Sequence, residues 1–223
     1  MRTICSCILL LAVYCQPAYT DGWESQNSGT GENLFDVFFI SSSTGWAVGS
    51  DGIVLKTTNG GSNWSSTTVS GGEHLRGVYF VSSTKGWAVG FSGAIYYTSN
   101  GGTNWNAQTP PTGYGSYDCF SVEFVSSSEG YIGAENGYIY HTTNSGTTWS
   151  YAGDAGGSVY GLSFTSASIG WAALAYGDVA KTTNSGGNWT KQIDESSGYF
   201  YGDVYFINSS DRSEEHTSEL QSL

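Results

Sequence analysis

Four carboxylates are the side chains of this sequence that come nearest to a catalytic pattern. Two acids that face one glycosidic bond can act as general acid and as base or nucleophile. Glu123, Glu129, Glu135 and Asp178 have the required type, but they are scattered and share no motif. We therefore expect no catalytic residue, and a two-carboxylate hydrolase stays open as the alternative.

The histidines and cysteines form no pattern of metal ligands or nucleophiles. His74 and His141 stand far apart, without the short spacing that zinc ligands have. Cys119 is the one cysteine that follows Thr20, so we expect it to be buried and inert, with no intrachain disulfide. The serine runs at 41–43 and 126–128 are typical of turns. We expect no cofactor and no bound metal.

The N-terminal segment from Met1 to Thr20 is typical of a signal peptide. Arg2 precedes a short apolar run over 4–13, and Ala18 and Thr20 are small enough for cleavage near either. The run is shorter than the roughly 20 residues of a membrane-spanning helix. We expect a secreted, periplasmic or cell-surface protein, with a lipid anchor at Cys15 as the less favoured alternative.

Charge and composition restrict the class of protein further. The 223 residues include 19 acidic and 7 basic side chains, a net charge of −12, which argues against nucleic acid and anionic membranes as partners. Apolar residues at 39% allow one packed core, and 32 glycines with 3 prolines favour short strands and tight turns. We expect a monomeric all-β domain.

Four segments of the sequence repeat in phase. The closing tryptophans Trp64, Trp105, Trp149 and Trp189 are 41, 44 and 40 residues apart, and glycine–aromatic pairs that begin at 45, 86, 130 and 170 have the same spacings. Each repeat contains four short apolar runs separated by turns, which predicts a β-propeller of four-stranded antiparallel blades. A solenoid of strands is the competing repeat fold. The large aromatic residues are expected to fill the gaps between blades, although an aromatic platform for sugars is the alternative.

The repeats define the predicted domain boundaries. The propeller is expected over 21–211, with blades at 34–69, 75–109, 119–152 and 159–194 and the start of another at 202–211. Trp23 stands before Asp36 at the same spacing at which Trp64 stands before Gly77, so its segment is expected to pair with a last blade and close the ring. Residues 212–223 lack the repeat pattern and look like a translated sequencing adapter, so we expect a non-native tail that leaves the propeller incomplete.

The turn before each closing tryptophan carries the same polar motif. We expect its side chains to bond the backbone of the turn between the third and fourth strands, which is a structural role. The residues of this motif are Asn59, Gly61, Trp64, Asn100, Gly102, Trp105, Asn144, Gly146, Trp149, Asn184, Gly186 and Trp189.

These turns resemble the Asp-box of sialidase-type (BNR) propellers, with asparagine in place of the usual aspartate. Together with Gly-Trp-Ala-Val-Gly at 45–49 and 86–90, they are similar to the repeats of the photosystem II assembly and stability factor family. The resemblance implies seven blades in family members, about three more than this sequence holds, and a basic patch in photosynthetic members. Arg76 is the one arginine between residues 21 and 211, so neither that patch nor the three-arginine site of a sialidase is expected here.

The predicted function is that of a non-catalytic interaction or scaffold module whose partner is a protein or a polysaccharide. A carbohydrate-binding or glycoside-processing propeller is the alternative. The longest repeat carries three extra residues within 108–118, and inserted surface loops often carry binding function. We therefore predict contact residues at Pro110, Pro111, Tyr114 and Tyr117.

Overall fold

The computed structural model describes residues 25–193, 201–206 and 212–216. The predicted leader over 1–20 and the predicted closing segment around Trp23 lie outside these ranges. In the described part, each repeat forms one four-stranded antiparallel sheet in which neighbouring strands follow chain order. Four such sheets are the predicted blades.

The strands of the first two blades are β1 (Leu34–Phe39), β2 (Gly45–Gly49), β3 (Ile53–Thr57), β4 (Ser65–Thr68), β5 (Leu75–Phe80), β6 (Gly86–Gly90), β7 (Ile95–Thr98) and β8 (Asn106–Ala107). Those of the third and fourth blades are β9 (Cys119–Phe124), β10 (Gly130–Ala134), β11 (Tyr138–Thr142), β12 (Ser150–Asp154), β13 (Val159–Phe164), β14 (Gly170–Leu174), β15 (Val179–Thr182) and β16 (Thr190–Ile193). A fifth sheet holds β17 (Tyr201–Phe206) and β18 (Arg212–His216).

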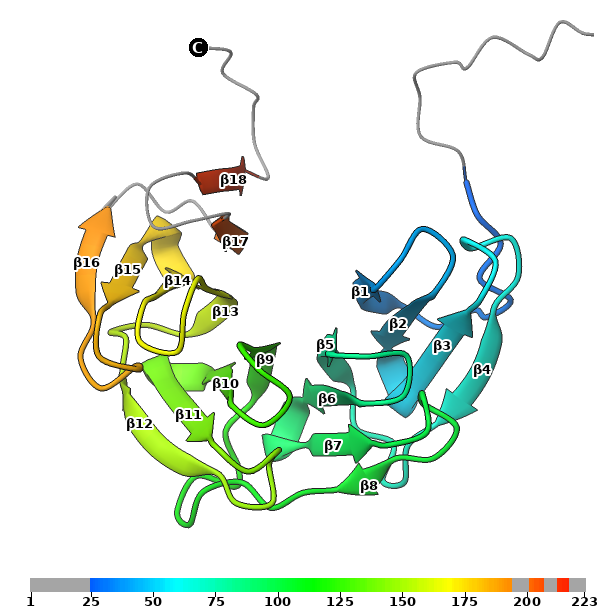
Figure 1. Cartoon of the computed structure of the whole chain (residues 1–223), viewed down its shortest axis with the longest axis horizontal. Coiled ribbons are helices and arrows are strands. Elements are labelled where there is room, and N and C mark those ends of the chain that lie inside the picture. Colours follow the sequence, from blue (N-terminus) through cyan, green and yellow to red (C-terminus); the bar gives the residue numbers. More distant parts are fainter. Residues whose placement is uncertain (1–24, 194–200, 207–211, 217–223) are drawn as a thin grey trace, which may run out of the picture.

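The blades fan around a common axis. Figure 1 shows the first strand of each sheet, β1, β5, β9, β13 and β17, around an open centre, with the fourth strands on the outside. The described sheets form an arc rather than a closed ring. This arrangement confirms the predicted propeller of four-stranded antiparallel blades.

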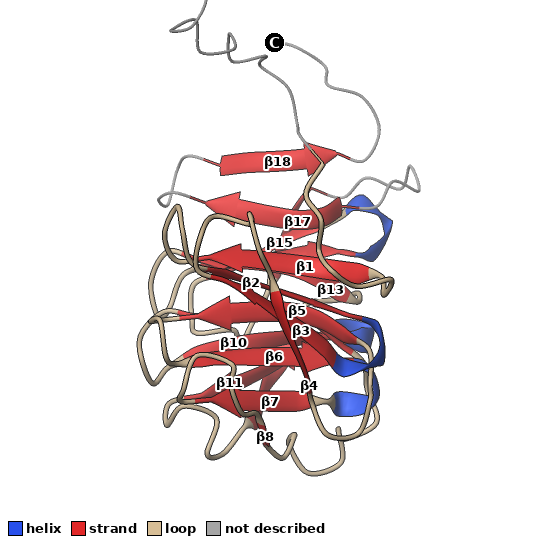
Figure 2. Cartoon of the chain, turned by 90° about the vertical axis from the view of Figure 1, so that its right-hand side faces the viewer, coloured by secondary structure: helices blue, strands red, loops and turns tan. Residues whose placement is uncertain are grey.

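Short 3₁₀ turns connect the second and third strands of each blade. They are η1 (Ser50–Gly52), η2 (Phe91–Gly93), η3 (Glu135–Gly137) and η4 (Ala175–Gly177). Figure 2 shows them along one edge of the molecule, so all four lie at the same end of the blades. No helix in the described ranges is long enough to cross a membrane.

The fifth sheet includes residues of the segment 212–223, which was predicted to be a non-native tail. β18 pairs antiparallel with β17, with Phe206 opposite Arg212 and Val204 opposite Glu214. Residues 212–216 therefore occupy the place of a second strand, although they lack the glycine–aromatic pair. The non-native origin of residues 212–223 stays a prediction, because any backbone can pair in this way whatever the origin of its sequence.

Stacked aromatic rings hold neighbouring blades together. Trp46 of the first blade lies flat on Phe80 of the second at 3.5 Å between ring centroids, and Trp87 lies on Phe124 at the same distance. The corresponding pairs at the next two interfaces are Tyr131 on Phe164 and Trp171 on Phe206. Because Trp46 and Trp87 are fully buried, the rings of the glycine–aromatic pairs fill the gaps between blades.

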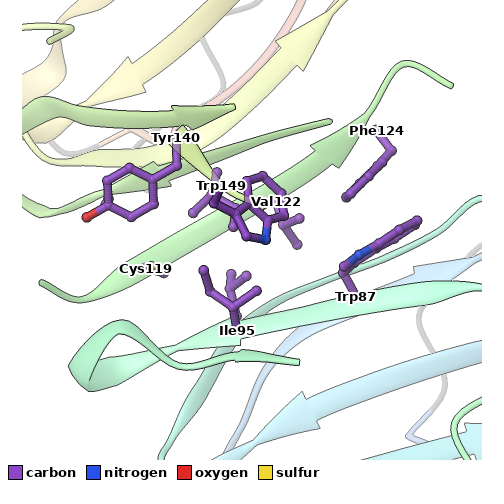
Figure 3. Close-up of a cluster of buried hydrophobic side chains, with 10 residues drawn as sticks. Trp87, Ile95, Cys119, Val122, Phe124, Tyr140 and Trp149 are labelled. Atoms are coloured by element: carbon purple, nitrogen blue, oxygen red, sulfur yellow. The ribbon is translucent and has the colours of Figure 1, made fainter. Parts of the chain in front are cut away.

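Phe80, Phe124 and Phe164 each also contact the closing tryptophan of their own blade. Phe124 meets the edge of Trp149 at 6.0 Å while Trp87 covers its face. Figure 3 shows this cluster between the second and third blades, with Trp87 and Phe124 side by side. Cys119 belongs to the same cluster, and its burial raises the pKa of the thiol far above its usual value, so the thiol stays protonated.

Among the described residues, no ring from a neighbouring blade covers the outward face of the first blade. Phe39 is 42% exposed, whereas Phe80, Phe124, Phe164 and Phe206 are all buried at the equivalent position. Val37, two residues earlier, is 57% exposed. The arc therefore presents the same kind of apolar surface that the other blades bury against a neighbour.

Candidate functional site: the central cleft and its rim

The motif turns at one end of the blades use their polar side chains internally. In the first blade, Thr57 Oγ1 accepts a hydrogen bond from the Gly61 amide at 2.9 Å and donates one to Asn59 Oδ1 at 3.0 Å. Asn59 Oδ1 also accepts from the Asn63 amide at 2.9 Å. The same bonds recur around Asn100, Asn144 and Asn184. These asparagines are therefore occupied in holding their turns.

Backbone bonds join these turns to the serine-rich turns between the first and second strands. The Gly60 amide donates to the Ser43 carbonyl at 2.9 Å, and equivalent bonds occur in the other three blades. The positive φ of Gly61, +88°, suits glycine at the turn. This end of the blades, called the motif end below, is a repeated scaffold.

The opposite end carries a β-bulge in the first strand of every complete blade. In the first blade Leu34 pairs with Gly49 and Asp36 pairs with Val48, so Phe35 is an extra residue without a partner. The corresponding residues of the next three blades are Arg76, Phe120 and Tyr160. A bulge redirects a side chain, and bulges are common beside binding sites.

All four bulge residues line one central cleft. The cleft has a volume of about 630 Å³ and is formed by β1, β5, β9, β13 and β17. The bulges bring together four large side chains from four successive repeats of the sequence. We call Phe35, Arg76, Phe120 and Tyr160 the rim.

Aromatic contacts orient the members of the rim. The Arg76 guanidinium lies over the Phe35 ring at 4.5 Å and over the Phe91 ring at 5.5 Å, which are cation–π distances. His74 meets the edges of the same two rings. Across the cleft, the ring centroids of Phe120 and Tyr160 lie 4.8 Å apart. The rim therefore has a cationic side at the first two blades and an aromatic side at the next two.

Two carboxylates inside the cleft connect neighbouring blades. Asp36 Oδ2 on β1 accepts a hydrogen bond from the Val78 amide on β5 at 2.8 Å. Glu123 Oε2 on β9 accepts one from the Phe164 amide on β13, also at 2.8 Å. Both acids thus satisfy backbone donors on the next blade while facing the cleft.

Burial makes the carboxyl groups of Asp36 and Glu123 weaker acids than they are in water. It raises the pKa of Asp36 to about 6 and that of Glu123 to about 8, and the nearby charge of Asp203 acts in the same direction. The backbone donors oppose these shifts without cancelling them. The folded chain therefore holds the protons of both acids more tightly than the unfolded chain does.

Close contact between inner strands restricts the positions next to the bulges. A Cβ atom on Gly161 would lie 2.5 Å from Asp203 Oδ1 and 2.7 Å from its Cα. Gly161 holds the position in the fourth blade that Asp36 holds in the first. The next inner strand lies too near for a side chain there, which explains the glycine.

The structure does not bring together the four carboxylates singled out from the sequence. Glu123 faces the cleft, whereas Glu129 pairs with His141 at 3.0 Å near the motif end. Glu135 lies in η3, and Asp178 pairs with Lys191. Within the described ranges no group of three His, Cys, Asp or Glu side chains could hold a metal ion.

The predicted contact loop packs against the third blade. Tyr114 stacks on Tyr151 at 5.0 Å with nearly parallel rings, and Tyr117 meets the edge of Tyr138 at 4.9 Å. Pro111 is buried and Pro110 is half-buried. None of the four predicted residues lines the central cleft, and their role in contacts stays a prediction.

The radial sheets and the repeated Asn-containing turns define an Asp-box β-propeller, the class to which BNR repeats belong. The sequence matches the family described as Photosynthesis system II assembly factor YCF48 over residues 16–76 and 72–214. The chain belongs to that family. A search of curated proteins finds no match.

Solved structures with the same fold include two YCF48 proteins. "YCF48 bound to D1 peptide" aligns with a TM-score of 0.68 at 21% identity, covering 86% of this chain and 64% of that one. YCF48 from Cyanidioschyzon merolae aligns with a TM-score of 0.67 at 21% identity, covering 83% and 63%. An ancestral GH74 enzyme aligns at 0.62 and 21% identity over 80% of this chain and 28% of its own. This chain thus spans less than two thirds of each, and the likeness concerns the fold.

Proposed function

We propose that this protein is an exported, non-catalytic module that binds a segment of another protein in the central cleft. The observation that carries the proposal is the repeated bulge, which aims one large side chain from each of four blades into the same cleft. Large aromatic side chains and arginine are the residue types that most often dominate the energy of protein interfaces.

The family supports a protein as the partner. One YCF48 structure has a D1 peptide bound, which makes a peptide a reasonable class of ligand to test. Export is proposed from the leader pattern over residues 1–20.

The absence of catalysis is proposed because the four carboxylates considered for hydrolysis do not converge. Glu123 faces the cleft, whereas Glu129 and Asp178 form ion pairs elsewhere and Glu135 lies in η3. A glycoside-processing role would need two acids that converge on one sugar bond. The GH74 likeness adds only a shared fold.

A binding experiment on the full chain tests the proposal. The chain would be screened against an array of overlapping peptides from exported proteins and from D1, and the affinity of each hit measured by fluorescence anisotropy. Phe120→Ala in the rim is expected to weaken binding at least about tenfold, because hot-spot aromatics carry about 2 kcal/mol or more. Thr112→Ala, in the exposed part of the 108–118 loop, is the control and should bind as the wild type does.

A second variant decides between the cleft and the loop. Replacing 110–117 with a short Gly-Ser turn should leave peptide binding intact if the cleft is the site. Loss of binding in this variant, with normal binding by Phe120→Ala, would contradict the proposal and favour the loop.

A further inference from the structure

We infer that the segment bound in the central cleft is positively charged: an extended peptide whose lysine or arginine side chain reaches Asp36 and Glu123. The inference rests on the proposed function and names the chemistry of the partner. It follows from three features of the cleft: its acidic interior, its aromatic rim and the charge of the whole chain.

Carboxylates from three blades face the interior of the cleft. Asp36 lies on β1, Glu123 on β9 and Asp203 on β17, and all three line the same space. They are near enough for the charge of Asp203 to raise the pKa of both other acids. Within the described ranges, neither Asp36 nor Glu123 forms an ion pair. The interior therefore favours a cation.

A cation can enter without breaking the bonds that join the blades. Asp36 uses each carboxylate oxygen for one backbone amide, Val37 for Oδ1 and Val78 for Oδ2. A carboxylate oxygen has two lone pairs, so each can accept a further donor. An ammonium or guanidinium group near these acids would favour their ionised form and offset the cost of their burial.

The rim suits the apolar part of such a side chain. Phe35 is 41% exposed, and Phe120 and Tyr160 form a second aromatic surface on the other side of the cleft. Lysine and arginine have apolar stems that pack along such surfaces while the charged group lies beyond. The cleft thus offers an aromatic entrance followed by carboxylates, in the order in which a long basic side chain would meet them.

An acidic segment is the alternative, and among the described residues that line the cleft, Arg76 is the one that favours it. Two aromatic rings hold the Arg76 guanidinium at the entrance. A carboxylate bound there would face Asp36, Glu123 and Asp203 and a chain with a net charge of −12. This field slows the approach of anions and accelerates that of cations.

A series of peptides that differ in one residue tests the inference. Extended ten-residue peptides of Gly, Ser and Phe would carry Lys, Gln or Glu at the central position, and their affinities for the full chain would be measured by fluorescence anisotropy at low and high salt. We expect the Lys peptide to bind at least about tenfold more tightly than the Gln peptide and the Glu peptide to bind most weakly. Added salt should reduce the difference.

Variants of the carboxylates assign the preference to the cleft. Asp36→Asn and Glu123→Gln keep an oxygen that can accept the backbone amide, so both should fold. Each is expected to reduce the preference for Lys over Gln about threefold or more, with little effect on the Gln peptide. Glu32→Gln makes the same charge change at an exposed residue outside the cleft and should leave the preference unchanged.

The outcomes separate the inference from the proposed function. Tighter binding of the Glu peptide, or equal binding of all three, would overturn the inference while leaving peptide binding in the cleft intact. An unchanged Lys preference in both cleft variants would overturn it as well. If no peptide of this series or of the earlier array binds, the proposed function fails and the inference fails with it.

Discussion

The two ends of each blade hold their turns in place with different kinds of hydrogen bond. At the motif end, side chains hold the turns: Thr57, Thr98, Thr142 and Thr182 each accept from a glycine amide and bond the following asparagine. At the rim end, the Ser50 amide donates to the Asn33 carbonyl, and the other three blades have the same backbone bond. The side chains that accept from the next amide of the turn differ in type, and they are His74, Asp118 and Ser158 in the first three blades. Side chains are therefore nearly identical at the motif end and free to differ at the rim.

The difference indicates where recognition can reside in a repeat protein. A side chain that completes a turn cannot change without a loss of stability. A bulge residue such as Phe120 makes no such bond, so its identity can serve a ligand instead. Four predictions test this division of roles, in order of expected effect.

The largest effect is expected from two phenylalanines on the same strand. Phe124→Ala should reduce the free energy of unfolding by about 3–5 kcal/mol, because the ring is buried between Trp87 and Trp149. Phe120→Ala, at the bulge, should cost no more than about 1 kcal/mol, since that ring is only half-buried. Urea unfolding followed by tryptophan fluorescence measures both. Equal losses would show that the rim is part of the scaffold.

A threonine of the motif end should come next. Thr98→Val removes the hydroxyl that accepts from the Gly102 amide and bonds Asn100, which leaves buried polar groups without partners. We expect a loss of about 2–3 kcal/mol in the same unfolding assay. Thr112→Val changes an exposed threonine and should alter stability by less than about 0.5 kcal/mol. A neutral Thr98→Val would contradict the structural role of the motif.

Glu123→Gln should stabilise the protein in a way that depends on pH. The pKa of Glu123 is raised to about 8 in the folded chain, so the folded state binds its proton more tightly than the unfolded state does. Its contribution to stability is complete below the unfolded pKa near 4.5 and is lost as the pH rises through 8. The amide avoids this loss and can still accept from Phe164, which predicts a gain on the order of 1 kcal/mol at pH 8.5.

The control for that prediction is the same comparison at low pH. At pH 4 the wild type and Glu123→Gln should differ little in urea unfolding, because the acid is then protonated in both states. A gain that is the same at pH 4 and pH 8.5 would show that desolvation of the charge is not its cause.

The smallest effect is expected at η4. Tyr176 has a φ of +68° and is 67% exposed, whereas Asn136 holds the same position in η3 at a φ of +59°. Asparagine tolerates this left-handed conformation better than tyrosine, so Tyr176→Asn should raise the free energy of unfolding by up to about 1 kcal/mol. Differential scanning calorimetry measures the change. A clear loss of stability would mean that the Tyr176 ring contributes to packing.

The sequence predicted the blades well because two independent features recur with one spacing. Glycine–aromatic pairs and closing tryptophans determine where Trp46 and Trp64 lie in a blade, and the other blades follow in phase. The four-stranded antiparallel sheets and the buried Cys119 are as expected. Repetition makes such a fold easier to predict from sequence, because each blade provides a check on the others.

The site was less accessible from the sequence. A bulge depends on pairing across two strands, and a glycine follows the bulge residue in two of the four blades, at Gly77 and Gly161, but not after Phe35 or Phe120. One signal was present: large side chains recur at positions 35, 76, 120 and 160, at the same spacings of 41, 44 and 40 residues as the closing tryptophans. Asp36 was not singled out because its partner, the Val78 amide, belongs to another blade. Likewise, proline and tyrosine marked the 108–118 loop as exposed, yet Tyr114 packs against Tyr151.

The bulge also determines which genetic changes such a chain tolerates. Substitution of Phe120 leaves the ladder between β9 and β10 in register, because that residue has no partner across it. Deletion of the same residue would leave Cys119 opposite Ala134, so the ladder would lose its bulge and the cleft would lose one side chain. Evolution, or a designer building a library, can therefore exchange or remove a bulge residue at the axis while the sheet that carries it keeps its register.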